Sequence, residues 1–342
     1  MIKKLLESVL HRSSYLTNTL YSGEGYIFML HRILPIEEKI KFDYNSSLAI
    51  TPKGLEDFIR QFQENNFDII SLDDAFFRLK KPKKNKFICF TIDDGYKDNL
   101  TFGLPVFEKM NVPFTVYISS CFPENRAIYW WYFLETHIKR NESIDLSSIG
   151  INFKLNNLID EQSKLDAFQK ASQIIKPLSY EKHKEFALKI CGLTQEELEG
   201  FNKQNNMTWD EIFELNKSSL VTIGAHTTDH VSLKNQSFQN SKNQIQESIL
   251  LLENKLGEKM NHFAYPYGAL TDAGKNEFNI LKSLNIKSAV YNHPGSVFKQ
   301  HLEFPYQLPR IGLTDETSIS RLKKLFSGRL HFEFNGSNKI LG

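Results

Sequence analysis

This chain of 342 residues contains few cysteines. Its three cysteines, Cys89, Cys121 and Cys191, are odd in number, and none stands in a Cys-x-x-Cys pair. A disulfide framework is therefore not expected, and a reducing compartment fits the sequence better. Because the sequence also shows no signal peptide or membrane-spanning segment, we expect a cytoplasmic protein, with attachment to a membrane surface as the alternative.

Long hydrophobic runs are also missing. No stretch approaches the roughly 18 apolar residues that a membrane-spanning helix needs. The N-terminus begins like a signal peptide, but charged residues such as Glu7 and Arg12 interrupt the apolar run that a signal peptide requires. Residues 2–20, within an N-terminal segment of residues 1–22, are instead predicted to form an amphipathic helix. This helix would either pack onto the domain or attach reversibly to a membrane surface.

An excess of charge of one sign is absent as well. There are 42 Lys and Arg residues against 40 Asp and Glu, which leaves a net charge of +2. Such a balance gives no reason to expect a polyanionic partner, so nucleic-acid binding is not predicted. Hydrophobic residues at 41% and charged residues at 24% are typical of a folded globular chain, which excludes disorder as a description of the whole chain.

What the sequence does contain is an alternation of buried strands and helices. Strands are predicted at residues 25–31, 87–92, 114–119, 220–226, 263–265, 287–291 and 308–313, and helices at residues 52–62, 97–110, 240–256, 271–284 and 316–326. This order is typical of a mainly parallel α/β sheet. Between residues 121 and 217 strands vanish and helical spacing dominates, which indicates a helical insertion in a single domain of residues 1–342. Residues 335–342 are expected to form a frayed tail.

Two aspartates follow the strand predicted at residues 87–92. Asp93 and Asp94 stand side by side at its carboxyl end, which is where parallel α/β folds build their sites. Neighbouring side chains on an extended segment point in different directions, so one carboxylate could bind a metal while the other faces the substrate. The alternative is an Asp-Asp-Gly turn that caps a helix and has no chemistry.

Two histidines follow another predicted strand. His226 and His230 are four residues apart, and they can converge on one ion if the segment is a helical turn. Pairs at this spacing also occur on solvated helix faces without any ligand. With Asp94 as a third ligand, the set would be two imidazoles and one carboxylate. Such a set leaves a coordination position open for water, as a catalytic metal site requires.

Two further segments place polar groups in apolar surroundings. The turn at Pro266, Tyr267 and Gly268 follows a short predicted strand and could present a backbone N–H to a site. Arg310 stands inside an apolar run. A buried arginine usually has a carboxylate partner, because an unpaired buried charge is costly. The alternative is an arginine whose charged head reaches solvent.

Together these motifs resemble those of the polysaccharide deacetylases, the NodB-like carbohydrate esterases. Residues 91–95, Thr-Ile-Asp-Asp-Gly, are similar to their Thr-Phe-Asp-Asp-Gly motif. Residues 226–230 are similar to their His-Ser/Thr-x-x-His motif, and residues 264–268 to their Arg-x-Pro-Tyr-Gly motif. The resemblance covers residues 25–120 and 218–315. It implies an α/β fold of the deformed (β/α) barrel type, with fewer than eight complete units.

The resemblance also implies a role for each matching residue. Asp93 would be the general base, and the backbone amide of Tyr267 would help to hold the oxyanion. Asp94, His226 and His230 would be the metal ligands. Zinc is the default for nitrogen and carboxylate ligands, with cobalt or nickel as alternatives.

The chain departs from the family pattern at two places. Many members orient the base with an arginine where this chain has Ala264, and we expect Arg310 to contact Asp93 and replace that arginine. The late Leu-x-x-His segment that usually carries the catalytic acid is not evident, since His331 lies in a poorly patterned tail. The Leu-His-Arg-Ile segment around His31 looks like the start of members whose barrel is circularly permuted. His31 is therefore predicted to be the acid.

These resemblances lead us to expect a metal-dependent de-N-acetylase that acts on N-acetylated sugars of a glycan or glycan precursor. Asp93 would take a proton from the metal-activated water, and His31 would protonate the leaving amine. Two alternatives stay open: hydrolysis of another amide or ester at the same site, and a non-catalytic glycan-binding protein. The insertion could cover the site through Trp130 and Trp131, or these residues could simply pack in the core.

Overall fold

The computed structural model describes residues 20–39 and 43–341. The amphipathic helix predicted over residues 2–20 lies outside the described residues, apart from Leu20. Within the two described ranges, no helix is both long and apolar enough to cross a lipid bilayer.

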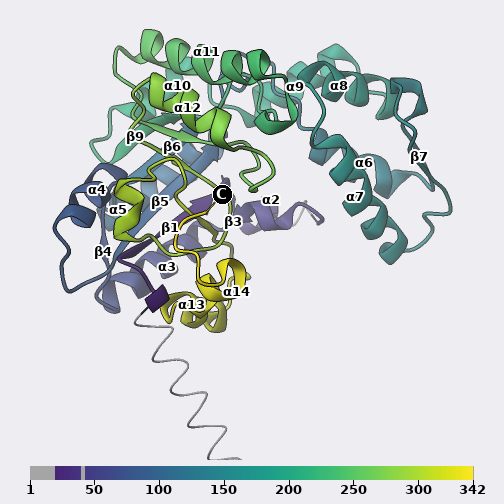
Figure 1. Cartoon of the computed structure of the whole chain (residues 1–342). Helices are drawn as coiled ribbons and strands as arrows, with labels where there is room; N and C mark the ends of the chain where they lie inside the picture. Colours follow the sequence, from purple (N-terminus) through teal and green to yellow (C-terminus); the bar gives the residue numbers. More distant parts are fainter. Residues whose placement is uncertain (1–19, 40–42, 342) are drawn as a thin grey trace, which may run out of the picture.

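A curled parallel sheet forms the centre of the molecule (Figure 1). Its order is β11-β10-β9-β6-β5-β1-β12, with β4 paired to β5 beside this path. An isolated parallel bridge between Val290 and Leu308 links the two ends of the sheet. The fold is therefore a deformed (β/α) barrel, as the sequence predicted. The strands are β1 (Gly25–Leu30), β4 (Asp68–Ile69), β5 (Phe87–Asp94), β6 (Phe114–Ile118), β9 (Val221–Ala225), β10 (His262–Ala264), β11 (Ser288–Val290) and β12 (Ile311–Gly312).

Helices cover the outside of this sheet. Their starts carry the expected signals: Thr51 accepts a hydrogen bond from the amide of Gly54 at the start of α3, and Ser71 accepts one from the amide of Asp74 at the start of α4. The covering helices are α3 (Pro52–Glu64), α4 (Leu72–Lys80), α5 (Leu104–Met110), α10 (Trp209–Asn216), α11 (Phe238–Leu256), α12 (Lys275–Ser283), α13 (Ile319–Phe326) and α14 (Arg329–Asn335).

The alternation of side chains along β5 explains how the sheet delivers polar groups to one edge. Every residue of β5 is buried, because helices cover one face and the barrel interior covers the other. Phe87 and Cys89 pack inside the barrel with Tyr117 and Leu308, whereas Ile88 and its outward neighbours pack under the helices. The inward series continues through residues 91 and 93. A carboxylate therefore lies at the inner mouth of the barrel.

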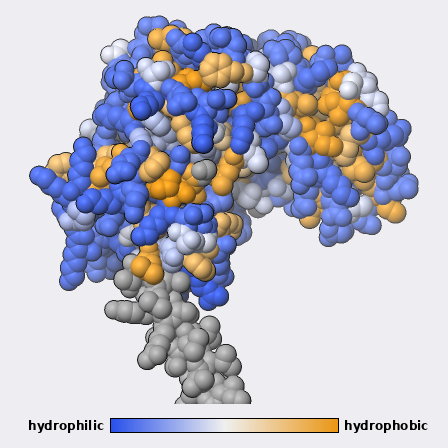
Figure 2. Space-filling model, in the orientation of Figure 1, coloured by the Kyte–Doolittle hydropathy of each residue, from blue (hydrophilic) through white to orange (hydrophobic). Residues whose placement is uncertain are grey.

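The insertion forms a separate lobe beside the barrel (Figure 1). Its helices α6 (Trp130–Arg140), α7 (Glu161–Ile175), α8 (Tyr180–Glu185) and α9 (Gln195–Asn205) surround an apolar cluster of their own. Figure 2 shows apolar side chains gathered on the visible face of this lobe, while most of the barrel's visible surface is hydrophilic. Two short antiparallel strands, β7 (Ile144–Asp145) and β8 (Lys154–Leu155), correct the expectation that strands vanish here.

Three local features of the structure also differ from what the sequence predicted. The helix predicted over residues 97–110 begins with a π-helical turn, Asn99–Gly103, before α5. A short parallel pair, β2 (Arg32–Ile33) with β3 (Ala49–Ile50), follows β1 and was not predicted; the helix α2 (Ile36–Lys39) lies between its strands. The tail is not frayed throughout, because Leu341 is buried against the core.

Candidate functional site

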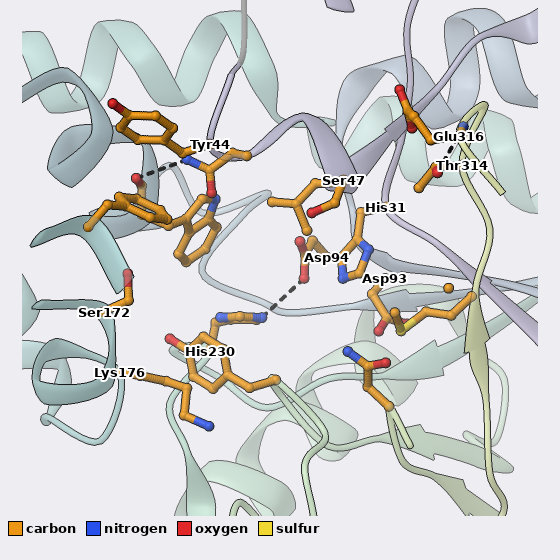
Figure 3. A pocket seen from close by; sticks show the side chains of 18 of the residues that line it. His31, Tyr44, Ser47, Asp93, Asp94, Ser172, Lys176, His230, Thr314 and Glu316 are labelled. Carbon is orange, nitrogen blue, oxygen red and sulfur yellow. Dashed lines mark hydrogen bonds and ion pairs between the residues drawn. The ribbon is translucent and has the colours of Figure 1, made fainter. Parts of the chain in front are cut away.

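A cavity of about 730 Å³ lies between the mouth of the barrel and the insertion. The barrel contributes His31, Asp93, Asp94 and His230 to its lining, among others. The insertion contributes both tryptophans of α6 and one face of α7. Figure 3 shows the three barrel side chains His31, Asp93 and Asp94 across the cavity from the α7 side. A cavity of this size is typical of sites that bind small organic molecules.

Asp93 is held in a buried, bidentate ion pair. Both of its oxygens accept hydrogen bonds from the guanidinium of Arg310, each at 2.6 Å. Arg310 is fully buried and also donates to the hydroxyl of Thr91 at 3.1 Å and to the carbonyl of Tyr291 at 3.1 Å. The predicted contact between Arg310 and Asp93 is thus present. Burial is the largest influence on Asp93 and acts to raise its pKa. The charge and hydrogen bonds of Arg310, with smaller contributions from His226 and His31, together outweigh burial and lower that pKa.

Asp94 points away from this ion pair, toward the two histidines. Its backbone has a φ of +85°, which ends the extended strand and turns the side chain. Its Oδ1 lies 3.1 Å from Nε2 of His230 and 3.4 Å from Nε2 of His226. One ligand atom from each of the three residues lies within 4.8 Å of the others.

The environment of these three groups fits a divalent metal. Oδ1 of Asp94 is buried, and it has no hydrogen-bond donor among the described residues. Nδ1 of His226 bonds the carbonyl of Ala264 at 2.8 Å, which leaves Nε2 of that ring free to face Asp94. Two imidazole nitrogens and one carboxylate oxygen converging on one point are a ligand set typical of zinc and related ions.

The segment from His226 to His230 is not the helical turn that the spacing suggested. Thr227 and His230 have positive φ values of 68° and 53°. The start of the insertion imposes this shape, because the amides of Ser120 and Cys121 donate to the carbonyls of Thr227 and Thr228 at 3.1 and 2.8 Å. The histidines therefore converge through an irregular loop braced from outside, which periodicity alone does not reveal.

The Tyr267 turn closes one side of the cavity. Tyr267 and Gly268 both have positive φ, and a Cβ at Gly268 would lie 2.4 Å from the amide nitrogen of Asn292, so only glycine fits there. The ring of Tyr267 stands 4.9 Å from that of His230, and its hydroxyl accepts a hydrogen bond from Nε1 of Trp130 at 2.8 Å. The Tyr267 amide has no hydrogen-bond acceptor within the described part of the chain.

His31 follows β1 and lines the same cavity, as its place at the strand end predicted. Its carbonyl accepts a hydrogen bond from the side chain of Asn99 at 2.8 Å, which fixes the backbone there. Burial lowers the pKa of His31 below 6.5, against the charges of Asp94 and Asp93, which act to raise it. A lower pKa makes the protonated ring a stronger acid, although fewer molecules carry that proton at neutral pH.

His331 lies apart from the cavity. It belongs to α14, is fully buried, and bonds the amide of Ser296 at 3.1 Å and the carbonyl of Asn338 at 2.8 Å. It is a structural link between the last helix and the chain near Ser296, so it offers no alternative to His31.

Sequence reasoning missed the residues that complete the far side of the cavity. Tyr44 and Asn45 come from the chain after α2, and Phe168, Ser172 and Lys176 come from α7. No motif marks any of these residues, and the helical spacing of the three α7 residues looks the same as that of any packed helix. Only the placement of the insertion against the barrel brings them to the site.

Comparison with known proteins gives a match to one protein family. Residues 192–289 match the model of a family described as polysaccharide deacetylase. That span includes both histidines and the Tyr267 turn, and it does not include Asp93 and Asp94. No match was found among curated protein sequences.

Several solved structures share the fold. A deacetylase from Streptococcus pyogenes, PplD, solved with acetate, is 16% identical with a TM-score of 0.55, covering 88% of this chain and 97% of that one. A de-N-acetylase from Aggregatibacter actinomycetemcomitans is 14% identical with a TM-score of 0.52, covering 88% and 98%. IcaB from Ammonifex degensii is 16% identical with a TM-score of 0.52, covering 90% and 98%. At these identities the likeness is one of fold.

Proposed function

Residues 192–289 match the polysaccharide deacetylase family, and from this premise we propose that the chain is a metal-dependent de-N-acetylase of N-acetylated sugars. One observation carries the proposal. His31, Asp93 of the buried Asp93–Arg310 ion pair, and Asp94 and His230 of the three-residue cluster with His226 all line one cavity. A base, a metal-ligand set and an acid are the groups that hydrolysis of an amide requires.

Asp94, His226 and His230 are the residues that would hold the metal. A zinc ion there, or cobalt or nickel, would supply Lewis-acid polarisation of the acetamide carbonyl and a lower pKa for the attacking water. Asp93 accepts the proton of that water, and Arg310 keeps its carboxylate ionised and aimed. The ion pair also compensates for the arginine that is absent at Ala264.

The remaining residues act on the carbonyl oxygen and the leaving nitrogen. The Tyr267 N–H donates a hydrogen bond to the carbonyl oxygen as negative charge develops on it. His31 donates a proton to the nitrogen as the C–N bond breaks, because an amine leaves poorly as an anion. The water oxygen ends on the acetyl carbon, so the products are acetate and a free amino sugar.

Acetate release from a panel of N-acetylated and O-acetylated sugars tests this function. We expect release from N-acetylated sugars that stops with a chelator and returns when zinc or cobalt is added. Release from O-acetylated sugars alone would favour the alternative of an esterase. Glycan binding without any acetate release would favour a non-catalytic protein. Cytoplasmic location and membrane attachment through residues 2–20 stay predictions from the sequence.

A further inference from the structure

Asp272 is a buried aspartate that the proposed mechanism does not use. It lies in the loop between β10 and α12, shortly after Tyr267 and Gly268. It is 1% exposed, and it does not line the cavity. A carboxylate buried this deeply is costly unless donors surround it. The donors that surround Asp272 therefore indicate what it does.

The carboxylate of Asp272 joins three segments of the chain. Its Oδ2 accepts a hydrogen bond from the amide of Ala269 at 2.9 Å, and its Oδ1 accepts one from the hydroxyl of Ser232 at 2.7 Å. The ammonium of Lys176 donates to both oxygens, at 2.9 and 3.0 Å. These partners belong to the Tyr267 turn, to the chain just after the metal-ligand loop, and to the end of α7 in the insertion.

The turn that Asp272 holds has a strained backbone. Tyr267 has a φ of +61°, which a bulky side chain rarely adopts, and such a conformation persists only where the surrounding contacts enforce it. On one side, the amide of Asn292 donates to the carbonyl of Gly268 at 2.7 Å. On the other side, Asp272 accepts from the amide of Ala269, and its own amide donates to the Ala269 carbonyl at 2.8 Å. The direction of the Tyr267 N–H therefore depends on Asp272.

The insertion braces the same turn from its own side. Nε1 of Trp130 donates to the hydroxyl of Tyr267 at 2.8 Å, and the ammonium of Lys176 lies 5.6 Å from the centre of the Tyr267 ring. Figure 3 shows the Lys176 side chain reaching from α7 toward the barrel side of the cavity. The side chain of Lys176 is 29% exposed, whereas that of Asp272 is fully buried. The positive charge that compensates the buried carboxylate thus comes from the insertion.

A purely structural role for Asp272 is the alternative. Other aspartates of this fold have such a role: Asp68 of β4 bonds the side chains of Arg78 and Asn85, and it does not line the cavity. Asp272 differs from Asp68 because its partners belong to the turn with the Tyr267 N–H and to the chain after the metal-ligand loop. The same substitution at the two aspartates should therefore have different effects on the rate.

We propose that Asp272 is a positioning residue for the deacetylation: it aims the Tyr267 N–H at the developing oxyanion, with Lys176 of the insertion as its counter-ion. The inference rests on the proposed function, which assigns the oxyanion to this N–H. Asp272 belongs neither to the cavity lining nor to the Asp94 cluster, so it acts through the turn. Because the N–H meets charge that develops only in the transition state, Asp272 affects kcat and leaves KM unchanged.

The test uses three single variants of the full-length protein loaded with zinc. Asp272→Asn keeps the shape but can accept hydrogen bonds through only one of its two terminal atoms. Lys176→Met keeps the apolar stem and removes the ammonium, and Asp68→Asn is the matched control. Acetate release from the β-1,4-linked tetramer of N-acetylglucosamine gives kcat and KM. Deuterium uptake by peptides covering residues 265–273, measured by mass spectrometry, reports on the turn without any substrate.

We expect Asp272→Asn to keep its zinc, to take up more deuterium over residues 265–273, and to lose about 10- to 100-fold in kcat with KM within about twofold of the wild type. Lys176→Met should show a smaller loss of kcat. The double variant should be no slower than Asp272→Asn, because the lysine acts through the aspartate. Asp68→Asn should keep the wild-type kcat and deuterium uptake. If thermal melting shows that Asp272→Asn fails to fold, Lys176→Met decides by the same two measurements.

A wild-type kcat in folded Asp272→Asn, a change in KM alone, or unchanged deuterium uptake over residues 265–273 would overturn the positioning role. An equal loss of kcat in Asp68→Asn would also overturn it, because lower stability would then explain the effect. The proposed function fails separately. Acetate release that continues unchanged in Asp272→Asn removes the positioning role and leaves the deacetylase. No release by the wild type from the tetramer or the sugar panel removes the deacetylase, and deuterium uptake alone then decides whether Asp272 holds the turn.

Discussion

Asp93 and Asp94 are neighbours in the chain, yet the structure gives them different partners. The two-residue period of β5 turns Asp93 into the barrel, where Arg310 meets it, and a positive φ turns Asp94 toward the histidines. The sequence predicted that the two side chains could diverge, because neighbours on a strand point in different directions, and the family resemblance implied which one would face the histidines. It did not predict the irregular loop before His230, because the segment contains no glycine and Thr227, a β-branched residue, rarely adopts a positive φ.

Replacing Asp93 with asparagine should separate base catalysis from metal binding. Asparagine keeps the shape and can still face Arg310, but it cannot accept the proton. We expect the Asp93→Asn protein to retain one equivalent of metal and to lose about 10²–10⁴-fold in kcat. Elemental analysis together with acetate release measures both quantities. A near wild-type rate would take Asp93 out of the mechanism.

Removing the charge of Arg310 should change both stability and the pH profile. The guanidinium holds the pKa of Asp93 down, so its loss raises that pKa. In Arg310→Gln, the acidic limb of kcat/KM should therefore move to higher pH, because the base is protonated over a wider range. The variant should also lose about 3–5 kcal/mol of stability, since a buried carboxylate is left unpaired. Rate profiles and urea unfolding measure the two effects, and an unmoved acidic limb would contradict the link to Asp93.

His31 should matter most when the leaving group is poor. His31→Ala should keep its metal and still bind substrate, because the ring is not part of the Asp94 cluster. Loss of the proton donor should slow amide hydrolysis more than ester hydrolysis, since an alkoxide leaves with less help than an amine. Parallel assays on N-acetyl and O-acetyl substrates measure how much of each rate the His31→Ala variant loses relative to the wild type. Equal losses on both substrates would argue against the acid role.

At the scale of elements, strands were easier to predict than the segments between them. The apolar runs of β1, β5 and β6 are fully buried, so their composition alone identifies them. The hairpin of β7 and β8 has two residues in each strand, which is too short for any period to show. The burial of Leu341 depends on the distant core and has no local signal.

His183 of α8 ties two helices of the insertion together and should make them sensitive to acid. It is buried, its Nε2 bonds the carbonyl of Ile175 at 2.9 Å, and its ring stacks on that of Trp130. Burial lowers the pKa of His183 from 6.5 to about 4. Between these values the unfolded chain binds the extra proton, so stability falls as pH falls from 6.5 to 4.

Replacing this histidine with glutamine should remove part of that acid sensitivity. Glutamine can still donate a hydrogen bond to the Ile175 carbonyl but cannot take the proton. We expect the loss of stability between pH 6.5 and 4 to shrink by up to about 3 kcal/mol in His183→Gln. Urea unfolding measures the free energy of unfolding of both proteins between pH 6.5 and 4. The contributions of the other titrating groups are the same in both proteins and cancel in the difference. Identical pH dependence would show that folding does not lower the pKa of His183.

At the scale of the whole molecule, the site joins parts of the chain that fold around separate cores. The barrel supplies the carboxylates and histidines of the site, and the insertion, with its own apolar cluster, supplies the far side of the cavity. The sequence predicted the barrel side because its motifs end strands of one parallel sheet. It could not predict which residues form the far side of the cavity. The packing of the insertion against the barrel depends on contacts such as the ion pair of Lys176 with Asp272, and no local sequence pattern indicates such a contact.

A metal at the Asp94 cluster should stabilise the whole fold, because its ligands come from the ends of β5 and β9, which pair through β6. A ligand that binds only the folded chain adds about 2.7 kcal/mol at 100 times its Kd. Zinc should therefore raise the Tm of the chelated wild type by several degrees.

The same addition should leave the Tm of His226→Ala unchanged. This variant also frees the Ala264 carbonyl, so its baseline stability falls; the comparison is therefore the zinc-induced shift within each protein. His137→Ala, in the insertion and outside the cluster, should keep the full shift. A shift that survives in His226→Ala would place the stabilising ion elsewhere, and the ligand role of His226 would then be wrong.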